Sequence, residues 1–239
     1  MRERLILALD LPTLREAEEV VRELRGEVGF FKIGLELFCA TGPAAVEMVH
    51  RHGGRVFLDL KFHDIPNTVA GAVRRGGAMG VEMLNLHAAA GTRALSAAVE
   101  AAREMASAHG RPAPVLLGVT VLTSLSAEDL AGQNIAAPVE QQVATLAAMV
   151  HAAGLDGVVC AGSEVRTIKR TCGKGFLTVV PGVRPAWAAT GDQRRTMTPA
   201  EALVCGADYL VLGRPVLASA DRRSALARIL AEMEEAIDA

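Results

Sequence analysis

Eight short, almost continuously apolar segments recur along the whole chain, and they constrain the fold more than any other feature of the sequence. Parallel strands buried on both faces have such continuous apolar sequences, whereas half-exposed strands alternate apolar and polar residues. We therefore predict eight parallel strands. The segments span residues 4–10, 30–34, 56–62, 83–88, 115–122, 157–162, 177–183 and 209–214.

The segments between these strands are rich in Ala, Glu and Arg at helical spacing, and several open with helix-start signals such as Thr13 followed by Glu16. Eight strands that alternate with helices in 239 residues predict an α/β fold, a single (β/α)8 TIM barrel that occupies residues 1–239 as one domain. The alternative is an open doubly wound sheet. That fold would have a Gly-rich first turn, which residues 9–13 lack.

Composition narrows the range of partners and locations. Charged residues make up 22% and the net charge is −2, so there is no basic field that favours nucleic acid. No apolar run approaches the roughly 18 residues of a membrane span, and the first run meets Asp10 too early for a secretory signal. We therefore expect a cytoplasmic protein. The four cysteines lie far apart, which argues against disulfides and a zinc site.

Charged side chains occur where a barrel core is expected. In segment 56–62, Asp59 and Lys61 share the face opposite to the one that packs on helices, and both lie near the end of the strand. The carboxyl ends of barrel strands carry the chemistry. Buried charges are normally paired, so we predict an alternating network, with an inert ion-pair network as the alternative. Its candidate members are Asp10, Lys32, Asp59, Lys61 and Asp64.

Lysine is scarce in this chain, which has only four lysines among 25 basic residues. Unlike arginine, lysine readily gives up a proton, and its pKa responds to burial and to neighbouring charges. The presence of Lys32 and Lys61 at inward positions therefore suggests proton transfer. Lys169 and Lys174 lie in what we interpret as an exposed helix and turn, and we assign them no role.

The ends of the seventh and eighth predicted strands carry glycine and arginine together, at Gly182 and Arg184 and at Gly213 and Arg214. Phosphate sites in barrels are often built from the loops after these two strands, and arginine binds phosphate through two parallel hydrogen bonds. We predict a phosphate site here. The alternative is that both arginines face solvent. Gln193, in the loop that follows, could fold over the phosphate.

At residues 59–68, the sequence DLKFHDIPNT resembles the D-x-K-x-x-D-I-P-N-T signature of the orotidine 5′-phosphate decarboxylase family. The resemblance extends over the whole chain. It includes LALD at 7–10, KIG at 32–34, LTS at 122–124, PGVRP at 181–185, GDQRR at 191–195 and LGRP at 212–215.

This resemblance implies an enzyme that removes the C6 carboxylate of orotidine 5′-phosphate to give UMP and CO2, the last step of de novo pyrimidine synthesis. It implies no metal and no organic cofactor. Lys61 would deliver the proton to C6, Asp59 would lie beside the substrate carboxylate, and Lys32 would hold the network and touch the ribose.

The resemblance also implies a substrate site shared across a homodimer. Asp10 would bind the ribose hydroxyls, and Thr123 would contact the pyrimidine. The residues that would reach into the partner's site are Asp64, Ile65 and Thr68. Those that would hold the phosphate are Arg184, Gln193, Gly213 and Arg214.

Two other functions remain as alternatives. The sugar-phosphate decarboxylases and aldolases of the same superfamily share D-x-K-x-x-D but need Mg²⁺ and an acid near the second strand, where this chain has Lys32. A non-catalytic barrel that binds UMP-like ligands as a regulator is the other alternative, and nothing in the sequence favours it.

Overall fold

The computed structural model describes residues 1–187 and 197–238 and shows a closed barrel of parallel strands in the order β1 to β8. Each strand pairs with the next along the chain, and β8 pairs with β1 to close the barrel. The predicted (β/α)8 TIM barrel is confirmed, and the open doubly wound sheet is wrong. The strands are β1 (Leu5–Ala8), β2 (Phe30–Ile33), β3 (Val56–Phe62), β4 (Met83–His87), β5 (Val115–Val119), β6 (Gly157–Val159), β7 (Leu177–Val180) and β8 (Tyr209–Leu212).

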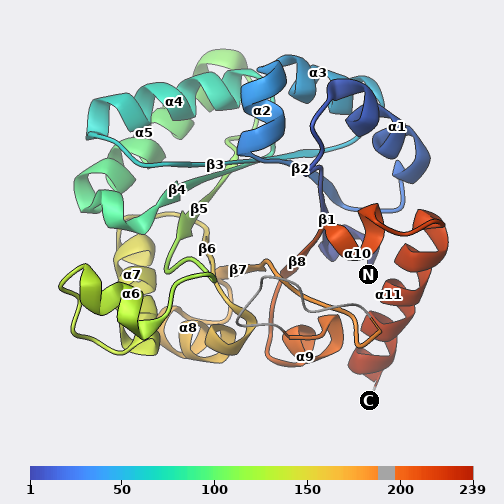
Figure 1. Ribbon diagram of the computed structural model, residues 1–239. Helices are drawn as coiled ribbons and strands as arrows, with labels where there is room; N and C mark the ends of the chain where they lie inside the picture. Colours follow the sequence, from blue (N-terminus) through green and yellow to red (C-terminus); the bar gives the residue numbers. More distant parts are fainter. Residues whose placement is uncertain (188–196, 239) are drawn as a thin grey trace.

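Helices form an outer ring around these strands (Figure 1). In the described parts of the chain, no helix is long and apolar enough to cross a membrane. The α-helices are α1 (Leu14–Leu24), α2 (Leu35–Thr41), α3 (Ala44–Arg51), α4 (Pro66–Ala78), α5 (Thr92–His109), α6 (Ala127–Gly132), α7 (Val139–Ala152), α8 (Val165–Cys172), α9 (Pro199–Val204), α10 (Arg214–Leu217) and α11 (Arg222–Asp238). Short 3-10 turns are η1 (Arg2–Arg4), η2 (Ala88–Ala90) and η3 (Gly162–Glu164).

The helix-start signal read from the sequence is present in the structure. The Thr13 side chain accepts a hydrogen bond from the backbone N–H of Glu16, at the start of α1. Every strand except β3 is shorter than its apolar segment, and β1 ends at Ala8 and β5 at Val119. Asp10 therefore lies two residues beyond the end of its strand.

The core has two layers because strand residues alternate between the inside and the outside of the barrel. Val56 and Leu58 belong to the large cluster between strands and helices, whereas Phe57 belongs to the smaller cluster inside the barrel. The inner cluster consists of Ile6, Ala8, Phe30, Phe57, Met83, Leu117, Val179 and Val211. The alternation along β3 directs the next odd-numbered residue, Asp59, toward the interior.

Candidate active site

A cavity of about 250 Å³ lies at the end of the barrel where the strands terminate. Residues at or just after the ends of every strand except β4 line it. Most of the predicted site residues are among them. The lining residues are Ala8, Asp10, Lys32, Phe57, Asp59, Lys61, Val119, Val121, Leu122, Thr123, Val159, Cys160, Pro181, Gly182, Arg184, Val211, Gly213 and Arg214.

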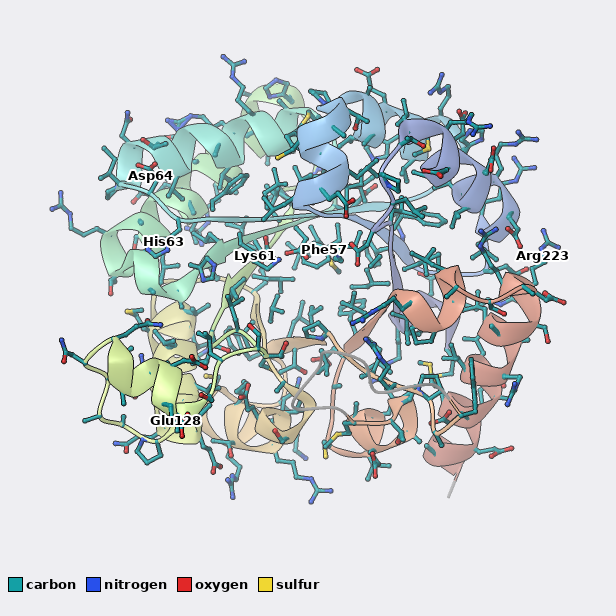
Figure 2. All side chains as sticks on the ribbon, in the orientation of Figure 1. Phe57, Lys61, His63, Asp64, Glu128 and Arg223 are labelled. Atoms are coloured by element: carbon teal, nitrogen blue, oxygen red, sulfur yellow. The ribbon has the colours of Figure 1, made fainter. Side chains whose placement is uncertain are left out.

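Strand β3 supplies two charged groups, and its backbone departs from a regular strand between them. Asp59 is only 8% exposed. Lys61 has a φ of 51°, in the left-handed region that non-glycine residues rarely adopt. The pairing of β3 with β4 changes register between Leu58 and Phe62. The period of two predicted an inward-facing Lys61 but not this turn of its backbone. Figure 2 shows Phe57 and Lys61 inside the ring of helices.

Four charged side chains form an alternating chain of acids and bases along one side of the cavity. Lys32 Nζ lies 3.1 Å from Asp10 Oδ1 and 3.3 Å from Asp59 Oδ2. Lys61 Nζ lies 2.7 Å from Asp59 Oδ1. Asp59 and Lys32 are buried, whereas Asp10 is exposed at the mouth. Each buried charge therefore has an opposite charge beside it.

The Asp59 carboxylate keeps its negative charge in this setting. Burial alone raises the pKa of Asp59, but the charges of Lys32 and then Lys61 outweigh it, with further help from hydrogen bonds from Lys61 and Asn85. The net result is that the pKa of Asp59 lies below its ordinary value. Because the Asp59 carboxylate stays ionised, the cavity has a fixed negative charge between two ammonium groups.

The lining of the same cavity includes the arginines and glycines predicted to hold phosphate. Arg184 is buried, and Arg214 begins α10 directly after Gly213. Gly182, with a φ of 75°, makes a turn between β7 and Arg184 that favours glycine. Thr123 lines the same cavity. Gln193 lies outside the described residues.

Three predicted site residues lie away from this cavity. Asp64 and Thr68 are exposed, and Ile65 is 67% exposed, which is unusual for a large apolar side chain. They flank the start of α4, where Asp64 Oδ1 accepts the backbone N–H of Ile65 over 2.7 Å. Figure 2 places Asp64 at the outer edge of the molecule, well away from Lys61. Of the five ionised groups expected at one mouth, the structure brings four together and leaves Asp64 outside.

Asn85, for which the sequence predicted no role, is in direct contact with the network. Its side chain bonds both Asp59 and the backbone of Lys61. The sequence signal that could have identified Asn85 as a site residue is a polar amide on the inward face of an apolar strand. His87, farther along β4, stacks near His63 with ring centres 5.4 Å apart. Burial, followed by the charges of His63 and Lys61, lowers the pKa of His87.

A divalent metal does not fit the acidic groups of this site. In residues 1–187 and 197–238, no group of three or more His, Cys, Asp or Glu side chains could hold a metal ion. The two carboxylates nearest each other in the network, Asp10 and Asp59, have the Lys32 ammonium between them. That ammonium lies where a metal ion would have to bind, and its positive charge would repel the ion.

A closed parallel barrel whose charged residues meet at the carboxyl ends of its strands belongs to the class of (β/α)8-barrel enzymes. Comparison with known proteins then gives the family. The chain belongs to the orotidine 5′-phosphate decarboxylase / HUMPS family, whose model matches residues 3–229. The resemblance read from the D-x-K-x-x-D-I-P-N-T segment is thereby confirmed.

Individual relatives agree with this assignment over nearly their whole length. The chain is 55% identical to orotidine 5′-phosphate decarboxylase from Moorella thermoacetica, over 98% of this chain and 93% of that protein. It is 51% identical to the protein of the same name from Syntrophotalea carbinolica, over 99% and 97%. Among solved structures, orotidine 5′-phosphate decarboxylase from Lactobacillus acidophilus superposes with a TM-score of 0.85 at 34% identity, covering 96% of this chain and 98% of that one.

Proposed function

We propose that this protein removes the C6 carboxylate of orotidine 5′-phosphate, giving UMP and CO2 in the last step of de novo pyrimidine synthesis in the cytoplasm. The alternating Lys32–Asp59–Lys61 chain in the cavity is the observation that carries the proposal. The names of the relatives support the same reaction. Arg184 and Arg214, which line the same cavity, supply the charge that a phosphate needs.

Lys61 is the proposed acid in the reaction. The bond between C6 and the carboxylate breaks, CO2 leaves, and the electron pair stays on C6 as a carbanion with little resonance stabilisation. A fixed ammonium stabilises charge where it develops and then transfers its proton to C6. Lys61 regains a proton from solvent, so the net reaction consumes one proton. Lys61 lines the cavity and is held 2.7 Å from Asp59, which keeps its ammonium in place.

Asp59 and Lys32 are proposed to act on the substrate as a pair. Asp59 would lie beside the substrate carboxylate and repel it, and this repulsion disappears as CO2 leaves. Lys32 would hold Asp59 in its ionised form and touch the ribose, whose hydroxyls Asp10 would bind. The contact of Lys32 with both Asp10 and Asp59 supports these roles.

The remaining cavity residues are proposed to bind and align the substrate. Thr123 would contact the pyrimidine. The phosphate would be held by Arg184, Gln193, Gly213 and Arg214. Binding energy from a phosphate remote from C6 can be used to align the reacting groups, which raises the rate rather than only the affinity. No metal or organic cofactor takes part in the proposed reaction.

We propose that the active unit is a homodimer in which Asp64, Ile65 and Thr68 complete the partner's site. Their exposure and their distance from the cavity of their own chain support this arrangement. An exposed Ile65 beside an acidic residue suits a surface that becomes buried on association.

A direct assay tests the proposal. Purified protein treated with EDTA should decarboxylate orotidine 5′-phosphate at an undiminished rate, followed by the change in ultraviolet absorbance. The Mg²⁺-dependent sugar-phosphate reactions of the same superfamily are the alternative. A strict Mg²⁺ requirement, or turnover of a ketose phosphate without turnover of orotidine 5′-phosphate, would contradict the proposal. Binding of UMP without any turnover would instead favour a regulatory barrel.

A further inference from the structure

Asn85 is a completely buried amide in the middle of β4, with 0% exposure. An amide carries donors and an acceptor, and burial without partners is unfavourable. Here both ends of the side chain bond to β3. Nδ2 donates to Asp59 Oδ1 over 2.6 Å, and Oδ1 accepts the backbone N–H of Lys61 over 2.8 Å. A leucine of similar volume would fill the space, so packing alone does not account for an amide here.

The bond to the Lys61 backbone falls where the β3–β4 pairing is irregular. Leu58 pairs with Leu84 and Phe62 pairs with Leu86, so residues 59–61 of β3 lie opposite Asn85 alone. The Asn85 side chain therefore takes the place of a backbone acceptor for the N–H of Lys61. That lysine has a φ of 51°, which is unfavourable for a residue with a side chain and persists only when its surroundings hold it.

The bond to Asp59 fixes the orientation of the carboxylate. Asp59 Oδ1 accepts from both Asn85 Nδ2 and Lys61 Nζ, at 2.6 and 2.7 Å. The second oxygen, Oδ2, is then directed at Lys32 Nζ, 3.3 Å away. If the Asn85 donor were absent, the carboxylate could rotate about its last bond and change its distance to both ammonium groups.

We propose that Asn85 is a positioning residue of the active site, which fixes the Asp59 carboxylate and the left-handed backbone of Lys61 at once and so determines where the Lys61 ammonium lies. Asn85 does not line the cavity, so it acts through these two residues and not on the substrate. The inference rests on the proposed decarboxylation, for which an exact position of the proton donor is required.

Two substitutions test the role of Asn85. Asn85→Leu removes both while keeping the volume, and Asn85→Asp keeps an acceptor for Lys61 but puts a second carboxylate against Asp59. Each should lower kcat for orotidine 5′-phosphate by about 100-fold, the scale of a misplacement of about 1 Å, and change KM little.

The matched control is Thr178→Val, which removes a buried hydroxyl that donates to Asp208 over 2.9 Å at the opposite end of the barrel. It should lower the melting temperature and leave kcat per folded molecule unchanged. If the Asn85 variants lost activity only in proportion to their loss of folded protein, as this control should, the proposal would be wrong. Should Asn85→Leu fail to fold, Asn85→Asp decides.

A second readout does not depend on turnover. Loss of the Asn85 donor removes a hydrogen bond to the ionised carboxylate, so the pKa of Asp59 should rise in Asn85→Leu. Carbon-13 NMR of the labelled Asp59 carboxyl would show its titration at higher pH than in the unmodified protein. An unchanged titration would overturn the proposal. If the unmodified protein does not decarboxylate orotidine 5′-phosphate, the proposed function fails while this titration still decides whether Asn85 positions Asp59.

Discussion

The two ends of the barrel use carboxylates in opposite ways. At the amino-terminal end, Glu82, Asp156 and Asp208 each precede an even-numbered strand by one residue and accept a backbone N–H from the strand before it. The donors are Val56, Leu116 and Thr178, at 2.7, 2.8 and 2.7 Å respectively. At the carboxyl-terminal end, Asp59 instead bonds side chains, and it faces a cavity. The first arrangement joins neighbouring strands, whereas the second leaves charge where a ligand can enter.

The lysines show the same contrast. Lys169 donates from Nζ to Asp208 and to the carbonyl oxygens of Lys174 and Phe176, so all three of its hydrogens have acceptors. Its side chain is only 13% exposed, which corrects the exposed position expected from sequence. Lys61 bonds Asp59 and lines the cavity. Two lysines paired with aspartate thus differ in whether the ammonium retains access to a ligand, and this separates a stabilising lysine from a candidate catalytic one.

The strongest test of this comparison substitutes each lysine by alanine. Lys61→Ala should lower kcat at least about 1,000-fold, because both the proton donor and a charge that stabilises the carbanion are lost. Binding of UMP, measured by calorimetry, should persist. Lys169→Ala should keep kcat and lower the melting temperature. A Lys61→Ala protein that retained a tenth of the rate would rule out the proton-donor role.

The parts of this contrast that sequence predicts are those with a local origin. A period of two along 56–62 predicts that Phe57 and Asp59 face the barrel interior, and continuous apolar runs predict parallel strands. The left-handed backbone of Lys61 depends on the register between β3 and β4, which is set by pairing with residues distant in sequence. The role of Asn85 could not be predicted for the same reason. Its bonds to Asp59 and Lys61 exist only because the β3–β4 register places these residues opposite it.

The exposed residues at the start of α4 offer a second test at the carboxyl-terminal end. If Asp64 acts in the partner's site, Asp64→Asn should reduce activity by about 100-fold, in the range of a positioned acid or base. Mixing Asp64→Asn chains with Lys61→Ala chains should restore activity, since one of the two sites in each heterodimer then has both residues intact. The measurement is specific activity after mixing under conditions that exchange subunits.

The control for that experiment uses the other end of the barrel. Chains with Asp156→Asn should keep kcat per folded molecule without any mixing, because Asp156 accepts a backbone N–H of its own chain and both Lys61 and Asp64 stay intact. No recovery in the Asp64→Asn and Lys61→Ala mixture, with subunit exchange shown independently, would argue against a contribution in trans.

The two arginines that line the cavity should have a smaller effect, which concerns substrate binding. Arg214→Ala should raise KM for orotidine 5′-phosphate about 10- to 100-fold, the equivalent of losing one or two charge-assisted hydrogen bonds. Orotidine without its phosphate should be processed equally by the variant and the unmodified protein. Arg4, which donates to the carbonyl oxygen of Asp208 at the opposite end, provides the matched Arg→Ala control. Equal losses with and without the substrate phosphate would remove Arg214 from the phosphate site.

The smallest expected effect is on pH dependence, and it concerns the Asp59 carboxylate at the carboxyl-terminal end. The pKa of Asp59 lies below its ordinary value, since burial, which raises it, is outweighed first by Lys32 and then by Lys61. Ionised Asp59 therefore stabilises the folded protein above its unfolded pKa of about 3.9, and this contribution is lost as pH falls through the lower folded value. Activity that requires the carboxylate should accordingly persist down to the pH at which Asp59 finally protonates.

Replacing the larger of the two favourable charges should move that limit. In Lys32→Met the pKa of Asp59 should rise, and the titration of its labelled carboxyl should shift to higher pH. Asp208→Asn, at the other end, should leave that titration in place and lower stability by about 1–3 kcal/mol, through weaker bonds to Thr178 and Lys169. If the two substitutions moved the Asp59 titration equally, the charges of the two ends would be coupled through the barrel, and the separation between a stabilising and a catalytic end would not hold.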